Sequence, residues 1–308
     1  MRIAILSVRP GWHTDELCRA LGERGHVGVV VPYEGLIARI AGSPNPVDDL
    51  ASDGVPLLSA DAVLARFIPA GTLEQLIYRV DALHWIEDRG LPVVNSPKAI
   101  ERTIDKFYTT ALLKGAGLPT PDTVVCENDK DALAAIKAMG DVVIKPIFGS
   151  MGHGLVRVSD PDVAFRVVQT LRQIGTVFYV QRVIDHGGRD VRAFVVGGRV
   201  IGAIERFVPA GDWRTNVSRG GSARAFELPS EWEELAVRAA AVVGADYAGV
   251  DLLPARDGSV FVVEVNGIPG WRGLQQAIGC DVAGHVVQHL LTRMEAGQSP
   301  GGLVGMPA

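Results

Sequence analysis

Short apolar runs alternate with amphipathic segments along the first 95 residues of the chain. The runs, which have the length of strands buried on both faces, lie at 3–8, 27–31, 62–68 and 92–95. Helical periodicity at 14–24 and 72–88 separates them, and the polar stretch 42–56 is expected to be a loop. Strands that alternate with helices pair in parallel. Residues 1–95 are therefore predicted to form an α/β domain with a parallel sheet.

From residue 96 onward, neighbouring strand-like runs favour antiparallel hairpins. Helices are expected at 97–115, 129–139, 160–173, 230–243 and 280–293. Strands are expected at 122–126, 141–145, 154–158, 177–181, 190–197, 199–207, 247–253 and 260–266, with a polar loop at 208–222. This mixture predicts an α+β fold for 96–295. Residues 296–308 are rich in Gly and Pro and are predicted to be a disordered tail.

Composition narrows the functional class. Of the 308 residues, 47% are hydrophobic, which is typical of a globular protein. The net charge is −5, which argues against binding of nucleic acid through a basic face. Apolar runs stay shorter than the ~18 residues of a membrane span, and the N-terminus lacks the apolar stretch of a signal peptide. The three cysteines are far apart and indicate no disulfide framework. We expect a cytoplasmic protein with neither a membrane nor a nucleic-acid partner.

A lysine at the end of a buried strand is followed at once by a glycine-rich loop. The strand ends at Lys145, and the loop contains Gly149, Gly152 and Gly154. Backbone N–H groups of such a loop can surround phosphate oxygens, and the lysine adds a positive charge. The spacing is neither that of the Walker A loop nor that of the kinase loop, which precedes its lysine. The alternative is a glycine-rich hairpin with a coincidental lysine.

Asp257-Gly258 is a strong signal for a two-residue hairpin turn. With that turn, Asp251 lies directly opposite Glu264, and Asn266 shares their face. Two carboxylates among Val, Leu and Phe repel each other and are costly to bury, and a hard divalent cation removes both problems. The set predicts a Mg²⁺ site. The alternative is that one carboxylate pairs with an arginine on a solvated face.

Arginines are concentrated between residues 182 and 224, where eight of them accompany four acids. Asp190 and Arg192 alternate onto one face of a strand, and Arg214 and Asn216 follow in a polar loop. A local positive surplus in an acidic protein indicates an anionic ligand, and arginine suits bidentate contacts to carboxylate and phosphate. The alternative is that these are ordinary solvated charges.

In this order, the motifs resemble the ATP-grasp superfamily and, more narrowly, the RimK-type glutamate ligases. The matching segments are Asn95-Ser-Pro-Lys-Ala-Ile, Asp105-Lys106, Gly117-Leu-Pro-Thr-Pro, Ile144-Lys-Pro, Gly149–Gly154, Gln181, Asp190-Val-Arg192, Arg206, Arg214-Thr-Asn216, Gly220-Gly221, Ala248-Gly-Val-Asp251 and Glu264-Val-Asn266-Gly-Ile-Pro-Gly270. The resemblance implies a two-lobed α+β ATP-grasp fold after the N-terminal domain. The central lobe at 96–185 would carry the phosphate loop, and the C-terminal lobe at 186–295 would carry the Mg²⁺ site.

The resemblance also implies the role of each site residue. ATP would be bound by Lys106, Lys145, Gly149, Ser150, Met151, Gly152, Gly154, Gln181, Arg182, Val183, Ile184 and Asp190. Mg²⁺, or Mn²⁺ in its place, would be held by Asp251, Glu264 and Asn266. The γ-phosphate and the acyl phosphate would face Arg192, Arg214 and Asn216. The family usually has an acidic and an aromatic residue after the glutamine, so Arg182 and Val183 depart from its pattern.

In the family reaction, ATP phosphorylates a carboxylate to give an acyl phosphate. An amine then attacks this acyl phosphate. The resemblance implies L-glutamate as the amine, with a small pterin-like cofactor or a protein C-terminus as the acceptor. Trp271 and Arg272 follow the metal motif, and two interpretations stay open: they stack on a flat acceptor such as a pterin, or Trp271 packs a loop. Two other functions stay open: a lysine-biosynthesis-type ligase that uses α-aminoadipate, and a non-catalytic ATP-binding regulatory module. A homo-oligomer, dimer or tetramer, is also implied.

Overall fold

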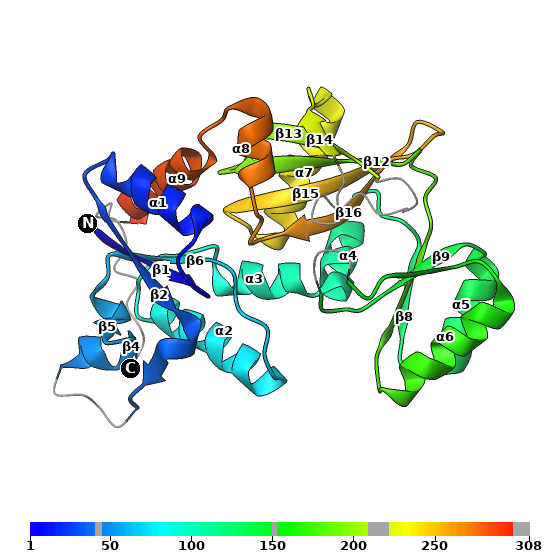
Figure 1. Ribbon diagram of the computed structural model, residues 1–308, viewed down its shortest axis with the longest axis horizontal. Helices are drawn as coiled ribbons and strands as arrows, with labels where there is room; N and C mark the ends of the chain where they lie inside the picture. Colours follow the sequence, from blue (N-terminus) through cyan, green and yellow to red (C-terminus); the bar gives the residue numbers. More distant parts are fainter. Residues whose placement is uncertain (41–44, 150–152, 209–221, 298–308) are drawn as a thin grey trace, which may run out of the picture. The chain divides into compact units, whose positions relative to one another are not determined.

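The computed structural model describes residues 1–40, 45–149, 153–208 and 222–297. Two compact units make up the chain (Figure 1). Unit 1 consists of residues 1–97 together with the chain from Asp281 onward, and unit 2 consists of residues 98–280. Within the described residues, none of the helices combines the length and the apolarity needed to cross a membrane.

Unit 1 is built on a four-stranded parallel sheet in the order β2-β1-β6-β7. Its elements are β1 (Arg2–Ser7), α1 (Trp12–Gly22), β2 (Val27–Pro32), β3 (Leu36–Ala38), β4 (Leu50–Ser52), β5 (Val55–Pro56), β6 (Ala62–Ala65), α2 (Leu73–Asp88), β7 (Val93–Val94) and α9 (Val282–Gly297). The central strands are buried along their whole apolar runs, as expected for a sheet covered on both faces. The predicted α/β domain with a parallel sheet is confirmed.

Helix α9 belongs to unit 1, although the sequence analysis assigned it to the C-terminal lobe. It packs against α1, and its buried face includes Val282 and Leu290. Arg19 of α1 forms an ion pair with Asp281 at 2.6 Å, just before α9 begins. The apolar face of the last helix is therefore covered by residues from the other end of the chain.

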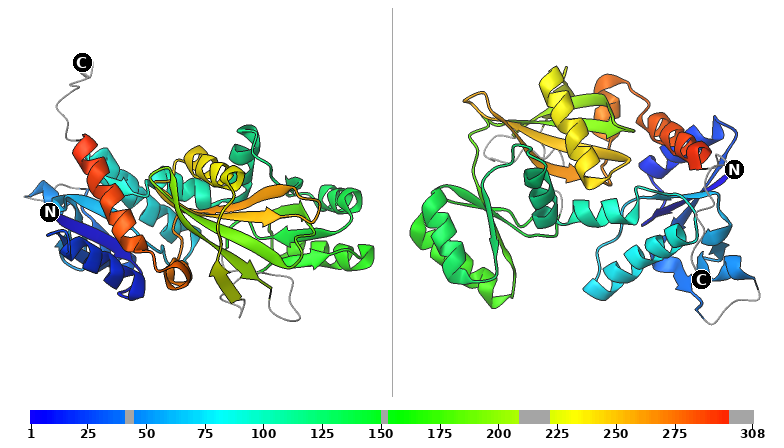
Figure 2. Two further views of the ribbon diagram at one scale, coloured as in Figure 1. Left: turned by 90° about the horizontal axis from the view of Figure 1, so that it is seen from above. Right: turned by 180° about the vertical axis from the view of Figure 1, so that it is seen from behind.

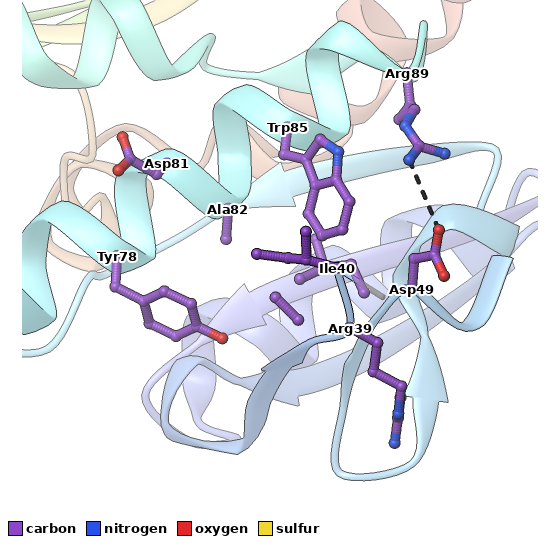
Figure 3. Close-up of a pocket in the computed structure, with 10 residues that line it drawn as sticks. Arg39, Ile40, Asp49, Tyr78, Asp81, Ala82, Trp85 and Arg89 are labelled. Atoms are coloured by element: carbon purple, nitrogen blue, oxygen red, sulfur yellow. Dashed lines mark ion pairs between the residues drawn. The ribbon is translucent and has the colours of Figure 1, made fainter. Parts of the chain in front are cut away.

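A small antiparallel sheet is formed by β3, β4 and β5, and two of its strands, β4 and β5, lie in the stretch 42–56 that was expected to be a loop. Its strands are two or three residues long, too short for an alternation of polar and apolar positions to show. A pocket of about 520 Å³ is lined by residues of this sheet and of α2, among them Tyr78, Trp85 and Arg89 (Figure 3). It contains none of the residues proposed to bind ATP.

Unit 2 contains two antiparallel sheets with helices packed on them (Figure 1). Its first elements are α3 (Pro97–Ile104), α4 (Lys106–Gly115), β8 (Thr123–Cys126), α5 (Asp129–Met139), β9 (Val142–Lys145), β10 (Val156–Val158), α6 (Pro161–Gln173) and β11 (Phe178–Arg182). Its later elements are β12 (Arg189–Val196), β13 (Arg199–Phe207), β14 (Ser222–Ala225), α7 (Ser230–Val243), β15 (Tyr247–Pro254), β16 (Val260–Asn266) and α8 (Arg272–Ile278). This arrangement confirms the expected α+β class.

The first sheet of unit 2 has the strand order β10-β9-β11-β8 and carries α5 and α6 on one face. Val142, Ile144, Phe178 and Val180 point into this helix-covered core. Because side chains alternate along a strand, Lys145, Tyr179 and Gln181 project from the opposite face. The hydrophobic core and the candidate site residues therefore lie on opposite faces of this sheet.

The second sheet has the order β14-β13-β12-β15-β16, and α7 covers one of its faces (Figure 2). Val191, Ala193, Val250 and Leu252 pack under this helix. The residues between them along β12 and β15, including Arg192 and Asp251, belong to the other face.

The helix expected at 97–115 is interrupted by Asp105, which separates α3 from α4. The Asp105 carboxylate accepts a hydrogen bond from the backbone N of Tyr108 at 2.9 Å and so caps α4. The interruption makes Lys106 the first residue of α4. Its backbone N donates to the carbonyl of Ile147 at 3.3 Å, which fixes this lysine beside the start of the glycine loop.

Candidate active site

Asp251 and Glu264 are a direct cross-strand pair, as the sequence predicts, but the turn between them differs from the expected one. The closing pair is Ala255 and Ser259, so the loop has three residues instead of two. The extra residue would shift the register by one position. A β-bulge beside Asp251 shifts it back, so that the two carboxylates again face each other.

The Asp251 carboxylate is held by two arginines. Arg192, its direct partner on β12, donates from Nε to Oδ1 and from Nη2 to Oδ2, each at 2.7 Å. Arg206 on β13 approaches Oδ2 at 2.9 Å and also binds Asp190 through two hydrogen bonds of 2.7 and 2.6 Å. A buried chain of alternating charge therefore crosses three strands, from Asp190 to Arg192.

The arginines determine the charge of Asp251. Burial alone would raise the pKa of this carboxyl group, but the guanidinium groups of Arg192 and Arg206 outweigh burial and lower the pKa well below its usual range. Burial alone would likewise lower the pKa of Arg206, whereas Asp251 and Asp190 raise it. Asp251 is therefore ionised at all physiological pH values. The open alternative of an Asp–Arg pair is realised, although the pair is buried and not on a solvated face.

Lys106 connects the glycine loop with the second carboxylate. Its Nζ atom donates to the carbonyl of Gly149 at 2.6 Å and lies 3.9 Å from Oε1 of Glu264. The side chain of Glu264 is 36% exposed, against 12% for that of Asp251. Of the two acids, Glu264 therefore keeps more access to a ligand.

The ammonium group of Lys145 is positioned by a hydrogen-bond network of neutral side chains. Its Nζ donates to Oε1 of Gln181 at 2.6 Å, and Nε2 of Gln181 donates to Oγ1 of Thr123 at 2.9 Å and to the Tyr179 hydroxyl at 3.1 Å. Burial is the main cause that lowers the pKa of Lys145, and Lys106 adds to it; Glu264 and Asp251 oppose both, and the net result is a pKa of about 8. The Gln181 amide, which was expected to bind ATP, therefore orients the lysine.

Gly149 and Gly154, in the described parts of the glycine loop, both lie close to Pro146 and favour glycine. A Cβ on Gly149, which has φ +155°, would lie 3.2 Å from Cγ of Pro146, and a Cβ on Gly154, with φ +74°, would lie 3.3 Å from the same atom. Five predicted site residues lie outside the described residues: Ser150, Met151, Gly152, Arg214 and Asn216.

The segment after Gln181 begins the link between the two sheets. Arg182 is exposed and forms an ion pair with Asp122 at 3.0 Å, and the backbone N of Val183 donates to the carbonyl of Asp141 at 2.9 Å. Val183 and Ile184 are half-buried. Their contacts with a nucleotide stay a prediction.

The donor set suits Mg²⁺ bound together with phosphate oxygens. Across the described ranges, no three His, Cys, Asp or Glu side chains form a group that could hold a metal alone. Asp251 and Glu264 supply two adjacent carboxylates, and Asn266 ends β16 next to them. Its Oδ1 accepts a hydrogen bond from the backbone N of Ile268 at 3.0 Å. Mg²⁺ commonly takes one or two carboxylates and completes its shell with phosphate and water, so these residues fit the ion.

Trp271 does not present a ring to an acceptor. Its side chain is 1% exposed and packs edge-to-face against Phe194, with ring centroids 6.2 Å apart. Of the two open interpretations, stacking on a flat acceptor is wrong, and a packing role for Trp271 is confirmed. A tryptophan between glycine, proline and arginine carries no sequence signal that separates these two roles.

Sequence reasoning left three parts of the site without a role: Arg206, Tyr179 and Thr123. Arg206 was seen only as part of the resemblance, because its pairing with Asp190 depends on the β12–β13 register. Tyr179 lies directly opposite Lys145 on the neighbouring strand. Its position two residues before Gln181 is the signal that could have placed both on the face of Lys145.

Comparison with known proteins decides the family. A family model described as the RimK-like ATP-grasp domain matches residues 103–290. The chain belongs to this family. As a RimK-like chain it is an enzyme of the ATP-grasp ligase class, and the expected ATP-grasp fold after an N-terminal α/β domain is confirmed.

Two relatives and one solved structure show how far this similarity extends. The tetrahydromethanopterin:alpha-L-glutamate ligase of Methanosarcina acetivorans is 34% identical over 307 residues, covering 91% of this RimK-like chain and 95% of that protein. A probable alpha-L-glutamate ligase of Trichodesmium erythraeum is 35% identical over 294 residues, covering 94% and 96%. The ATP-grasp ligase PsnB, complexed with a phosphomimetic precursor variant, Mg and ADP, shares the fold with a TM-score of 0.74 at 23% identity, covering 95% and 98%.

Proposed function

We propose that the chain is an ATP- and Mg²⁺-dependent ligase that joins the amine of L-glutamate to a carboxylate of an acceptor. The observation that carries this proposal is the charged row formed by Arg192, Asp251 and Glu264, which are direct neighbours across β12, β15 and β16. Lys106 lies beside this charged row, and Lys145 is electrostatically coupled to both of its acids. Such a set can bind a polyphosphate and a divalent cation side by side.

The proposed reaction has two steps. An oxygen of the acceptor carboxylate attacks the γ-phosphorus of ATP, the bond from that phosphorus to the bridging oxygen breaks, and ADP leaves. The glutamate amine then attacks the acyl carbon, phosphate leaves with the electron pair of the C–O bond, and the amine loses a proton. The products are ADP, phosphate and an amide. No covalent enzyme nucleophile takes part, so positioning and charge neutralisation do the catalytic work.

The residues divide this work between binding and orientation. Lys106, Lys145 and the loop 149–154 would bind the phosphates, with Arg182, Val183, Ile184 and Asp190 on the nucleoside side. Mg²⁺, held by Asp251, Glu264 and Asn266, would neutralise phosphate charge. The transferred phosphoryl group would be met by Arg192, and by Arg214 and Asn216 from outside the described residues.

For the acceptor we favour a small cofactor of the pterin type over a protein C-terminus. Support comes from the Methanosarcina acetivorans relative, a tetrahydromethanopterin:alpha-L-glutamate ligase, which aligns over almost its whole length. The burial of Trp271 removes the stacking argument, so this preference no longer rests on that residue. We place the reaction in the cytoplasm, where the three free thiols would stay reduced. A homo-oligomer stays a hypothesis.

A label-transfer experiment tests this function. The purified protein is incubated with ATP, Mg²⁺ and labelled L-glutamate in a cell extract that is then separated into proteins and small molecules. Label among the small molecules supports the cofactor acceptor, and label on protein makes a protein C-terminus the acceptor. ADP release stimulated by α-aminoadipate instead of glutamate would identify the lysine-biosynthesis type. Nucleotide binding without turnover with either amine would indicate the regulatory module.

A further inference from the structure

The guanidinium group of Arg192 covers the side of Asp251 that a chelated metal ion would use. It binds both carboxylate oxygens side-on, each at 2.7 Å, while Arg206 adds a third donor at 2.9 Å. A planar guanidinium that binds two oxygens of one carboxylate uses the lone pairs that point to the same side. A cation cannot take that position until Arg192 leaves it.

The carboxylates of the charged row already have protein cations as neighbours. Asp251 has Arg192 and Arg206, and Glu264 has Lys106 at 3.9 Å. A divalent ion that arrives without a nucleotide therefore meets positive charges at short range in a partly buried site, where such repulsion is strong. An ion that arrives with ATP brings phosphates that attract those same side chains.

Of the two arginines, Arg192 is the one free to move. Arg206 has a side chain that is 5% exposed and is bound to Asp190 by two further hydrogen bonds. The Arg192 side chain is 20% exposed, and within the described residues both of its side-chain hydrogen bonds go to Asp251. Gly249 lies directly beside it, because a Cβ there would contact Cδ of Arg192 at 3.4 Å.

We propose that Arg192 stands in for the metal ion in the nucleotide-free enzyme and exchanges places with it when Mg²⁺ and ATP bind together. The guanidinium neutralises Asp251 while the site is empty, moves to the phosphates when ATP enters, and so clears Asp251 for the ion. This inference rests on the proposed function, because it takes the ligands to be ATP and Mg²⁺. It makes binding of the ion depend on the nucleotide, so that Asp251 has a second counter-charge beside Arg206 in both states.

The exchange predicts opposite effects of one substitution on two binding reactions. Replacing Arg192 with glutamine removes a competing cation, so Mn²⁺ alone should bind on the order of tenfold more tightly than to the wild type. The same change removes a phosphate contact, so binding of Mn²⁺ together with a non-hydrolysable ATP analogue should weaken on the order of tenfold. Free Mn²⁺ is measured by its electron paramagnetic resonance signal during titration, so no turnover is needed.

Arg189→Gln is the matched control. Arg189 lies on the same strand and binds Glu205 at 2.6 Å instead of Asp251, so its replacement removes the same charge without opening the metal position. Both Mn²⁺ affinities should stay within about twofold of the wild-type values, because an exposed charge further away is screened. A change equal to that of Arg192→Gln would show that net charge alone sets the metal affinity, and would overturn the exchange.

Arg192→Lys keeps the inference testable if Arg192→Gln does not fold. A lysine keeps the charge but not the bidentate contact with Asp251. The affinity for Mn²⁺ alone should therefore lie between those of the wild type and the glutamine variant. Unchanged or weaker binding of Mn²⁺ alone in folded variants would overturn the exchange. Failure of the proposed function looks different: the wild type would not bind Mn²⁺ even with the analogue, and Asp251→Asn would make no difference.

Discussion

The Nζ atom of Lys145 lies 2.6 Å from Oε1 of Gln181, a residue on the neighbouring strand β11. A positive charge expected to meet ATP phosphates is thus oriented by a neutral amide, which is itself fixed by Thr123 and Tyr179. Gln181 is 4% exposed, so ligand atoms have little access to it. The lysine and the glutamine act as one unit, and changes at either should show in nucleotide binding.

Gln181→Leu should raise the KM for ATP about tenfold and change kcat much less, because the lysine keeps its charge but loses its orientation. Gln181→Glu places a carboxylate within hydrogen-bond reach and should raise the pKa of Lys145. A positioning role therefore predicts that the pH profile of ATP binding shifts upward in the glutamate variant. Equal profiles in the glutamate variant and the wild type would contradict it.

Affinity for ATP should fall above about pH 8. The pKa of Lys145 is lowered to about 8, chiefly by burial, so the lysine loses its proton above that pH. Above pH 8, Lys145 must therefore take up a proton again when ATP binds. We expect binding at pH 9.5 to be roughly tenfold weaker than at pH 7. Isothermal titration in EDTA, with ATP and without metal, measures this dependence.

Lys145→Arg is the control for that profile. A guanidinium keeps its charge over the whole pH range, so its binding curve should be flat between pH 7 and 9.5. If this variant shows the same decline as the wild type, another group titrates and Lys145 is not responsible.

Asp251→Asn should lower kcat/KM about 10²- to 10³-fold, because the change removes charge from the proposed metal site and from the pair with Arg192. ADP release measures the effect, and circular dichroism checks that the variant folds. Asp257→Asn is the matched change at an exposed turn in the same hairpin. Its rate should match that of the wild type, and a fully active Asp251→Asn enzyme would exclude the metal assignment.

Trp271→Ala should act on stability and not on the acceptor. Removing a buried indole costs about 3–5 kcal/mol, so the chain should unfold at a clearly lower denaturant concentration. Trp271→Phe retains an aromatic contact with Phe194 and should be milder. If the KM for the acceptor rose while the stability stayed unchanged, Trp271 would have a role in binding the acceptor instead of in packing.

The sequence was most informative where a periodic pattern met a specific turn or motif. Apolar runs located the parallel strands of unit 1, and alternation placed Asp251 and Glu264 on one face. The pairing was predicted from a two-residue turn, whereas the chain has a three-residue loop and a compensating bulge. A turn signal predicts the hairpin, but the length of its loop and the position of the bulge depend on how the strands pack.

Other features depend on contacts between distant segments, which no local pattern reports. The partners of Arg206 lie 16 and 45 positions away in sequence, on two other strands. The break at Asp105 could have been read from its capping side chain, but the helical periodicity on both sides hid it. Helix α8 and the short strands β4 and β5 were missed because each is too short for a periodic signal.

Helix α9, from the C-terminal part of the chain, completes the unit that the N-terminal residues form. Unit 2 is inserted between the two segments that build unit 1. A fragment made of residues 1–97 alone would leave the face of α1 that α9 covers open to water, and a stop codon after Cys280 would do the same to the full chain. A stop codon ahead of α9 should therefore cause aggregation through unit 1, and supplying α9 as a separate peptide should relieve it.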